Sequence, residues 1–103
     1  MLAVTRCRVP SGQENVFAAA ARDVLDVLGA RPGFRRGWVG RAMDDQCQWV
    51  LSTEWESVGA YRRGLSAYDS KVALAPLMVF IVDEPSAYDV VLSVEASSSS
   101  RDR

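Results

Sequence analysis

The sequence predicts a small domain of the α+β class, and three observations support this prediction. The chain has 103 residues, of which 49% are hydrophobic and 24% charged, as in an ordinary globular domain. Short apolar segments rich in β-branched residues lie at 2–9, 34–43, 47–56 and 87–94. Amphipathic stretches with helical spacing follow the first and the third. The order β-α-β-β-α-β predicts a ferredoxin-like fold, in which two helices cover one face of a four-stranded antiparallel sheet.

The first strand and the first helix are separated by a turn. Strand 2–9 ends at Pro10, and Ser11 and Glu14 have the S-x-x-E spacing of a capping box. In such a box each side chain satisfies a backbone N–H group at the start of a helix. Apolar residues then recur at helical spacing as far as Gly29. We therefore predict a helix from this capping box to Gly29.

The two middle strands, 34–43 and 47–56, form a predicted hairpin around Asp44–Gln46. Alternation in the second strand places five residues on one face, namely Cys47, Trp49, Leu51, Thr53 and Trp55. Apolar residues also occupy the opposite face, since Trp38 and Val39 are adjacent in the chain. A sheet with one face in water alternates more cleanly. We therefore predict that a second copy covers the other face, in a C2 homodimer stacked sheet to sheet.

The second half of the chain contains the second helix and the last strand. Ser57 is the predicted N-cap of a helix whose apolar stripe is Val58, Tyr61, Leu65, Tyr68 and Val72. The pattern of segment 76–82 is compatible with three structures, namely a lid over a pocket, an extension of this helix or part of the dimer interface. The fourth strand is predicted at 87–94, where the domain 1–94 ends. Residues 95–103 are polar and of low complexity, which predicts a disordered tail.

Composition argues against several classes of function. With 12 basic and 13 acidic side chains the chain lacks the positive surplus of a general nucleic-acid binder. No apolar run reaches the ~18 residues that span a bilayer, so we expect no membrane partner and a cytoplasmic location. Cys7 and Cys47 lack metal-ligand spacing and are expected to be small buried side chains. The chain has no histidine, the commonest general base and metal ligand, so no metal site is expected.

Aromatic residues form the richest set of candidate functional side chains, namely Trp38, Trp49, Trp55, Tyr61 and Tyr68. One interpretation is a solidly packed core, the usual role of such a stripe. The alternative is a flat apolar cleft between sheet and helices, in which tyrosine hydroxyls orient a planar ligand and an inward arginine stabilises an oxyanion. Glu54, at the end of a strand, is a candidate general base, although charges at strand ends are usually solvated.

Two segments of the chain resemble a known protein family. The run Trp49–Lys71, WVLSTEWESVGAYRRGLSAYDSK, and the segment DEPSAY at 83–88 resemble the antibiotic biosynthesis monooxygenase-type domains of actinobacteria. The similarity extends over about 1–94, and Trp55 matches the family's tryptophan at the end of the third strand. It implies a dimeric α+β barrel with a pocket between sheet and helices in each protomer. Members include cofactor-free oxygenases that act on polycyclic phenols and anthrones, and haem-degrading enzymes.

Some residues of this chain differ from the family pattern, and these differences argue for or against each of the family's activities. Haem-degrading members use a strand asparagine, the tryptophan and a helix histidine, whereas here the only asparagine is Asn15 and Leu65 falls near the histidine position. The resemblance therefore implies that no haem, flavin or other cofactor is used. The asparagine that cofactor-free members place before the tryptophan is also missing, with Leu51 or its neighbours there. This gap favours a second hypothesis, a non-catalytic small-molecule-binding or accessory protein of a biosynthetic pathway.

The leading hypothesis is a homodimeric, cofactor-independent monooxygenase-like protein that binds a planar aromatic or polyketide-like substrate and reacts it with O₂. Trp55 is expected to form the pocket wall, while Tyr61 and Tyr68 orient the ligand. Arg6 or Arg8 would stabilise an enolate or phenolate, and Glu54 would act as base. The remaining predicted substrate-binding residues are Trp38, Trp49 and Leu65.

Overall fold

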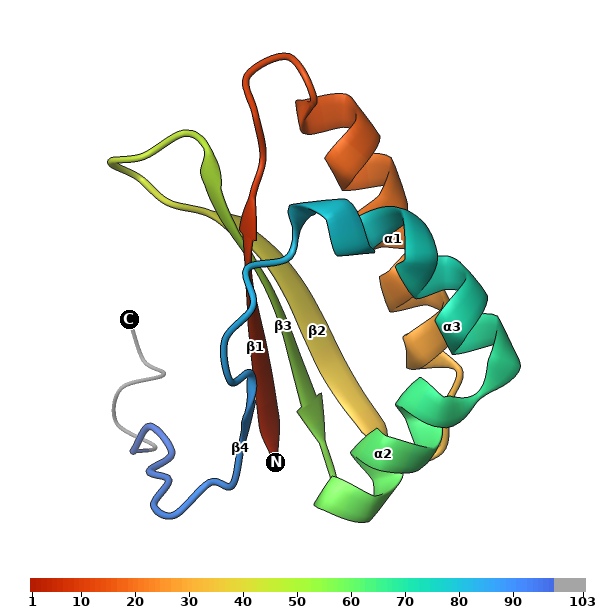
Figure 1. Cartoon of the computed structure of the whole chain (residues 1–103). Coiled ribbons are helices and arrows are strands. Elements are labelled where there is room, and N and C mark those ends of the chain that lie inside the picture. Colours follow the sequence, from red (N-terminus) through yellow and green to blue (C-terminus); the bar gives the residue numbers. More distant parts are fainter. Residues whose placement is uncertain (98–103) are drawn as a thin grey trace.

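The computed structural model describes residues 1–97, and its order of elements confirms the predicted ferredoxin-like α+β fold (Figure 1). Its strands are β1 (Leu2–Arg8), β2 (Phe34–Arg41), β3 (Gln48–Trp55) and β4 (Ala87–Tyr88). Its helices are α1 (Glu14–Gly29), α2 (Val58–Ser66), α3 (Tyr68–Leu74) and the 3₁₀ helix η1 (Ala75–Phe80). Within this part of the chain, no helix is long and apolar enough to cross a membrane.

The four strands form one antiparallel sheet in the order β2-β3-β1-β4. The helices lie on one side of this sheet (Figure 1), and we call the face that they cover the inner face and the opposite one the outer face. Thr5 lies opposite Leu51 in the register of β1 and β3, and Ala3 lies opposite Thr53. Because side chains alternate along a strand, these residues all point to the inner face.

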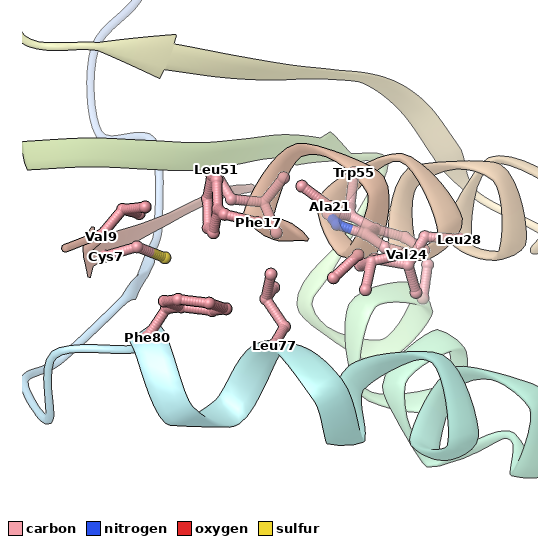
Figure 2. Packing of buried hydrophobic residues seen from close by; sticks show 12 residues of the cluster. Cys7, Val9, Phe17, Ala21, Val24, Leu28, Leu51, Trp55, Leu77 and Phe80 are labelled. Carbon is pink, nitrogen blue, oxygen red and sulfur yellow. The ribbon is translucent and has the colours of Figure 1, made fainter. Parts of the chain in front are cut away.

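The hydrophobic core fills the layer between the inner face and the helices. Figure 2 shows Leu77 and Phe80 of η1 pointing toward Phe17 of α1 and Leu51 of β3. The rings of Phe17 and Phe80 meet edge to face at 5.4 Å. Trp55, 1% exposed, is the largest fully buried side chain. The third strand thus presents its predicted apolar face to the core.

The predicted helix through Val72 is divided in two. Ala67 has an extended backbone, with φ −62° and ψ 144°, which ends α2 and turns the chain so that α3 packs against α1. The Ser70 hydroxyl donates a hydrogen bond of 2.6 Å to the carbonyl of Gly64, one of the carbonyls that the end of α2 leaves without a helical partner. Prediction of one continuous helix was wrong, and residues after Ala67 no longer share the stripe of α2.

The start of α1 also differs from the prediction. The N-cap is Gln13, and no side-chain hydrogen bond caps it, so Ser11 does not form the predicted capping box. The Glu14 carboxylate instead accepts a hydrogen bond of 2.8 Å from the backbone N–H of Gly12. Gly12 has φ +93°, a conformation that favours glycine and that carries the turn ahead of the helix.

The last strand is much shorter than the predicted 87–94. Tyr88 lies opposite Leu2, the first residue of β1, so the residues that follow run past the start of β1 and have no strand beside them. Val90 and Val94 instead turn back beside Leu2 on the outer face. Most of the predicted disordered tail, at 98–103, lies outside the described residues.

Segment 76–82 is mainly helical. It forms most of η1 and continues into Ile81, which makes an isolated bridge with Cys7. Leu77 and Phe80, both buried, anchor this segment to the core. Of the three alternatives, an extension of the preceding helix therefore describes its structure.

Candidate functional site

A cavity of about 210 Å³ lies between the inner face and the helices. Its walls are mostly hydrocarbon, and the polar side chains that the described residues contribute to it carry hydroxyl groups. The lining residues are Ala3, Thr5, Val24, Leu28, Leu51, Thr53, Tyr61, Leu65, Leu74, Met78, Ile81 and Ser86. Such a cavity suits an apolar ligand with one or two oxygen atoms, because each hydroxyl can donate a hydrogen bond in an environment of low polarity.

The secondary structure brings these hydroxyl-bearing side chains to the cavity. Thr5 on β1 and Thr53 on β3 point to the inner face through the alternation of their strands. Tyr61 and Leu65 stand one turn apart on α2 and therefore line the same wall. Ser86 arrives just ahead of β4. Strands, a helix and a loop thus each contribute to one site.

Trp55 lies behind the cavity wall and fixes two of its members. The indole N–H donates a hydrogen bond of 2.9 Å to the hydroxyl oxygen of Thr53. The indole ring also meets Tyr61 edge to face at 5.9 Å and Phe34 at 5.1 Å. A Cβ atom on Gly64 would lie 2.6 Å from the indole, so glycine is required for this close approach of α2. Trp55 therefore supports the site from outside it.

The hydroxyl protons of the cavity are available to a ligand. The Thr53 oxygen accepts from Trp55, which leaves its own O–H group to donate and polarises it. Within residues 1–97, no hydrogen bond engages the hydroxyls of Thr5 and Tyr61. These three groups can therefore donate to a ligand oxygen, and most strongly to one that carries negative charge.

The predicted arginines lie on the outer face instead. Arg6 faces outward opposite Val50 and pairs with Glu84 at 3.4 Å. Arg8 pairs with Asp45 at 2.9 Å. The sheet separates both guanidinium groups from the cavity, and within residues 1–97 no charged side chain lines it.

Glu54 also faces outward. Its carboxylate accepts a hydrogen bond of 2.8 Å from Arg36 and lies 3.7 Å from Arg35. The hydrogen bond from Arg36, together with the positive charges of both arginines, lowers the pKa of Glu54. A carboxylate with a lowered pKa is a weaker base, and the structure does not bring this one to the cavity.

The remaining aromatic residues are dispersed. Trp38 is 45% exposed on the outer face, with the Arg36 guanidinium 5.4 Å from its ring centre. Trp49 faces inward but packs against Phe17 at 5.3 Å, and it does not line the cavity. Tyr68 is 78% exposed on the outside of α3, because the extended Ala67 takes it off the stripe of α2.

Of the predicted site residues, the structure thus brings together Tyr61 and Leu65 in the cavity wall, with Trp55 behind them. Sequence reasoning missed the hydroxyls of Thr5, Thr53 and Ser86. One signal could have found Thr53, since it is a polar residue between Leu51 and Trp55 on an otherwise apolar strand face. Ser86 offers no comparable signal, because the turn of the chain after η1 brings it in.

The described residues contain no group of three or more Asp, Glu, Cys or His that could hold a metal ion. Both cysteines are free thiols. Burial raises the pKa of Cys7 to about 11, so this thiol is protonated at neutral pH.

A hydroxyl-lined apolar cavity beneath a ferredoxin-like sheet places the protein among small α+β domains with a pocket between sheet and helices. The model of the antibiotic biosynthesis monooxygenase family matches residues 1–71, and the chain belongs to this family. A search of curated proteins finds no match to the chain.

Several solved structures share the fold of this chain. SnoaB, described as a cofactor-independent oxygenase from Streptomyces nogalater, is 20% identical, with a TM-score of 0.75 over 94% of this chain and 95% of its own. A protein from Deinococcus radiodurans that carries the family's name is 10% identical, with a TM-score of 0.77 over 94% and 98%. A conserved protein from Methanosarcina mazei is 13% identical, with a TM-score of 0.71 over 84% of each chain. At these identities the likeness is one of fold.

Proposed function

We propose that this protein is a cofactor-independent monooxygenase that binds a planar phenol in the inner cavity and presents it to O₂. The observation that carries the proposal is the set of hydroxyl donors, Thr5, Thr53 and Tyr61, in the wall of an otherwise apolar cavity. Membership of the monooxygenase family supports it, as does the similarity to SnoaB, described as a cofactor-independent oxygenase.

The contribution of the protein is to bind and orient the substrate and to favour its anion. Hydrogen bonds from Thr53 and Tyr61 to a phenol oxygen stabilise the phenolate more than the phenol, which lowers the pKa of the bound substrate. No carboxylate or other strong base lines the cavity, so the phenolic proton passes to solvent as the substrate binds. The apolar walls then hold the electron-rich ring beside O₂.

The reaction balances without a reductant. With 1-naphthol as the probe, carbon 4 of the ring is oxidised and the product is 1,4-naphthoquinone. One oxygen atom of O₂ becomes the new carbonyl oxygen, and the other leaves as water with the two hydrogens that 1-naphthol loses. The substrate itself supplies all four electrons that O₂ accepts.

Oxygen uptake tests this function. We expect the protein to consume O₂ with 1-naphthol and to form 1,4-naphthoquinone in equal amount. Tyr61→Phe should lower kcat/KM about 10-fold, the value of one hydrogen bond to a charged group. Tyr68→Phe is the matched control, because this hydroxyl lies outside the cavity, and it should leave the rate unchanged. No uptake above the buffer rate, or equal losses in both variants, would contradict the proposal.

A non-catalytic small-molecule-binding or accessory protein of a biosynthetic pathway is the second candidate, and the lack of any strong base in the cavity favours it. Such a protein would bind 1-naphthol, with quenching of tryptophan fluorescence, but consume no O₂. Oxygen uptake and fluorescence titration of the same sample therefore separate the two functions.

We also infer a C2 homodimer with stacked outer faces. Trp38, Val4 and Val50 lie on that face, and no described helix covers it. Burying a half-exposed tryptophan with its aliphatic neighbours favours association. Sedimentation should give a dimer that Trp38→Asp dissociates, and a monomeric wild type at micromolar concentration would contradict this inference. A cytoplasmic setting is part of the proposal, supported by the two free thiols.

A further inference from the structure

Tyr61 belongs to the walls of two separate hollows. One is the inner cavity already described, of about 210 Å³. The other, of about 250 Å³, lies beyond α2 toward the start of β1 and the end of β4. Its walls are formed by Met1, Val58, Tyr61, Arg62, Ala87, Tyr88 and Asp89. Among the described residues, Tyr61 alone belongs to both walls, so its side chain lies between the two hollows.

We propose that Tyr61 sets the upper size limit of the ligand and restricts the inner cavity to neutral, one-ring or two-ring phenols. This inference rests on the proposed function, because it requires the inner cavity to bind aromatic molecules.

Volume supports this limit. An apolar cavity of about 150 Å³ accommodates benzene, whereas sites for drug-sized ligands occupy about 300–1,000 Å³. The inner cavity, at about 210 Å³, lies between these values. It holds more than a single ring and less than an extended polycycle. A larger ring system would have to displace Tyr61 to enter the second hollow.

Packing holds the Tyr61 side chain in place. The Tyr61 ring meets the indole of Trp55 at 5.9 Å. Trp55 is itself immobilised by its hydrogen bond to Thr53 and by Phe34. These contacts therefore hold the Tyr61 ring between the two hollows. One side chain both orients the ligand and limits its length.

Charge separates the two hollows as well. None of the described residues that line the inner cavity is charged, whereas Arg62 and Asp89 line the second hollow. An anionic substituent that entered the inner cavity would lose its hydration without gaining a cation, which is costly. The inner cavity therefore selects a neutral molecule that ionises only at the oxygen facing Thr53 and Tyr61.

The test compares two fluorescent phenols of different size, 1-naphthol with two rings and 1-hydroxypyrene with four. Affinities are measured by fluorescence titration of wild type, Tyr61→Ala, Tyr61→Phe and Leu65→Ala. Wild type should bind 1-naphthol at least about 10-fold more tightly than 1-hydroxypyrene. Tyr61→Ala should reverse or abolish this preference by joining the two hollows. Tyr61→Phe keeps the ring and should keep the preference for the smaller phenol.

Leu65→Ala is the matched control, since it enlarges the inner cavity without opening it to the second hollow. It should still prefer 1-naphthol. Tyr61→Val provides the same opening with more apolar bulk and replaces Tyr61→Ala if circular dichroism shows that the alanine variant is unfolded. Equal affinities of wild type for both phenols, or equal gains of 1-hydroxypyrene binding in the Leu65 and Tyr61 variants, would overturn the size limit set by Tyr61. Failure of wild type to bind 1-naphthol at all would instead refute the proposed function.

Discussion

The two faces of the sheet are made from the same strands but have opposite chemistry. The inner face carries apolar residues and hydroxyls around a cavity without charge, whereas the outer face carries arginines paired with carboxylates. The residue types that usually indicate catalysis are therefore on the face where they neutralise one another. The functional groups with access to an enclosed ligand are the less conspicuous hydroxyls.

Alternation along one strand creates this contrast. On β1, Thr5 and Cys7 point inward while Arg6 and Arg8 point outward. A shift of register by one residue would exchange the two sets completely. The face that a side chain occupies therefore decides whether it can reach an enclosed ligand.

The largest expected contrast is in thiol reactivity. Cys7 is fully buried on the inner face and its pKa is raised to about 11, whereas Cys47 is half-buried at the edge of the hairpin. At pH 8, DTNB should modify Cys47 at least about a thousandfold faster than Cys7, which reacts only when the core opens. Cys47→Ser should remove the fast phase. Two equally fast thiols would mean that the inner face is open to solvent.

The next largest expected contrast is between the stability losses caused by replacing two tryptophans of the same hairpin. Trp55→Ala removes a fully buried ring on the inner face and should lower the free energy of unfolding by about 3–5 kcal/mol. Trp38→Ala on the outer face should cost less, and its effect should depend on protein concentration because it acts through the dimer. Urea unfolding at several concentrations measures both. Equal, concentration-independent losses would contradict the distinction between the faces.

A smaller contrast in the free energy of unfolding is expected between substitutions of two threonines on the inner face. Thr53→Val deprives the buried Trp55 N–H of its acceptor and should cost about 1–3 kcal/mol. Thr5→Val removes a hydroxyl that makes no hydrogen bond within the described chain, so it should be nearly neutral. Urea unfolding again gives both values. A loss in Thr53→Val no larger than that in Thr5→Val would show that the Thr53 hydroxyl does not anchor the indole.

The smallest effect concerns the charges of the outer face. The lowered pKa of Glu54 means that its ion pair stabilises the folded state above the ordinary carboxyl pKa, and that this contribution disappears as the pH falls through the lowered value. Wild type should therefore exceed Glu54→Gln slightly in stability at pH 7, and this advantage should shrink as the pH falls into the acid range. Arg36→Gln in both backgrounds isolates the pair. A difference that grows toward acid would have the wrong sign.

Much of the fold was predictable because it depends on local pattern. Alternation around Leu51 and Trp55 and the helical period before Gly29 each specify an element from adjacent residues. The two elements that were predicted wrongly depend on residues that lie far away in the sequence. The 87–94 strand ends at Tyr88 because β1 begins at Leu2, and the second helix breaks at Ala67, where α3 turns to pack on α1.

The site was less predictable than the fold. The helical stripe correctly predicted that Tyr61 and Leu65 line the site. The prediction for Arg6 and Arg8 was wrong because their side chains point to the opposite face of the sheet. Composition drew attention to charged groups, and only the strand register reveals that they face away from the cavity. Ser86 reaches the cavity through the irregular chain after η1, where no periodic pattern operates.

The proposed function requires the ligand to occupy the inner cavity and not the outer face. Methyl NMR of the protein titrated with 1-naphthol tests it directly, because an aromatic ring shifts the methyl signals that it contacts. We predict shifts at Leu65 and Ile81, which line the inner cavity, and none at Val4 and Val50 on the outer face. Shifts confined to Val4 and Val50 would show that 1-naphthol binds to the outer face, which would contradict the proposed function.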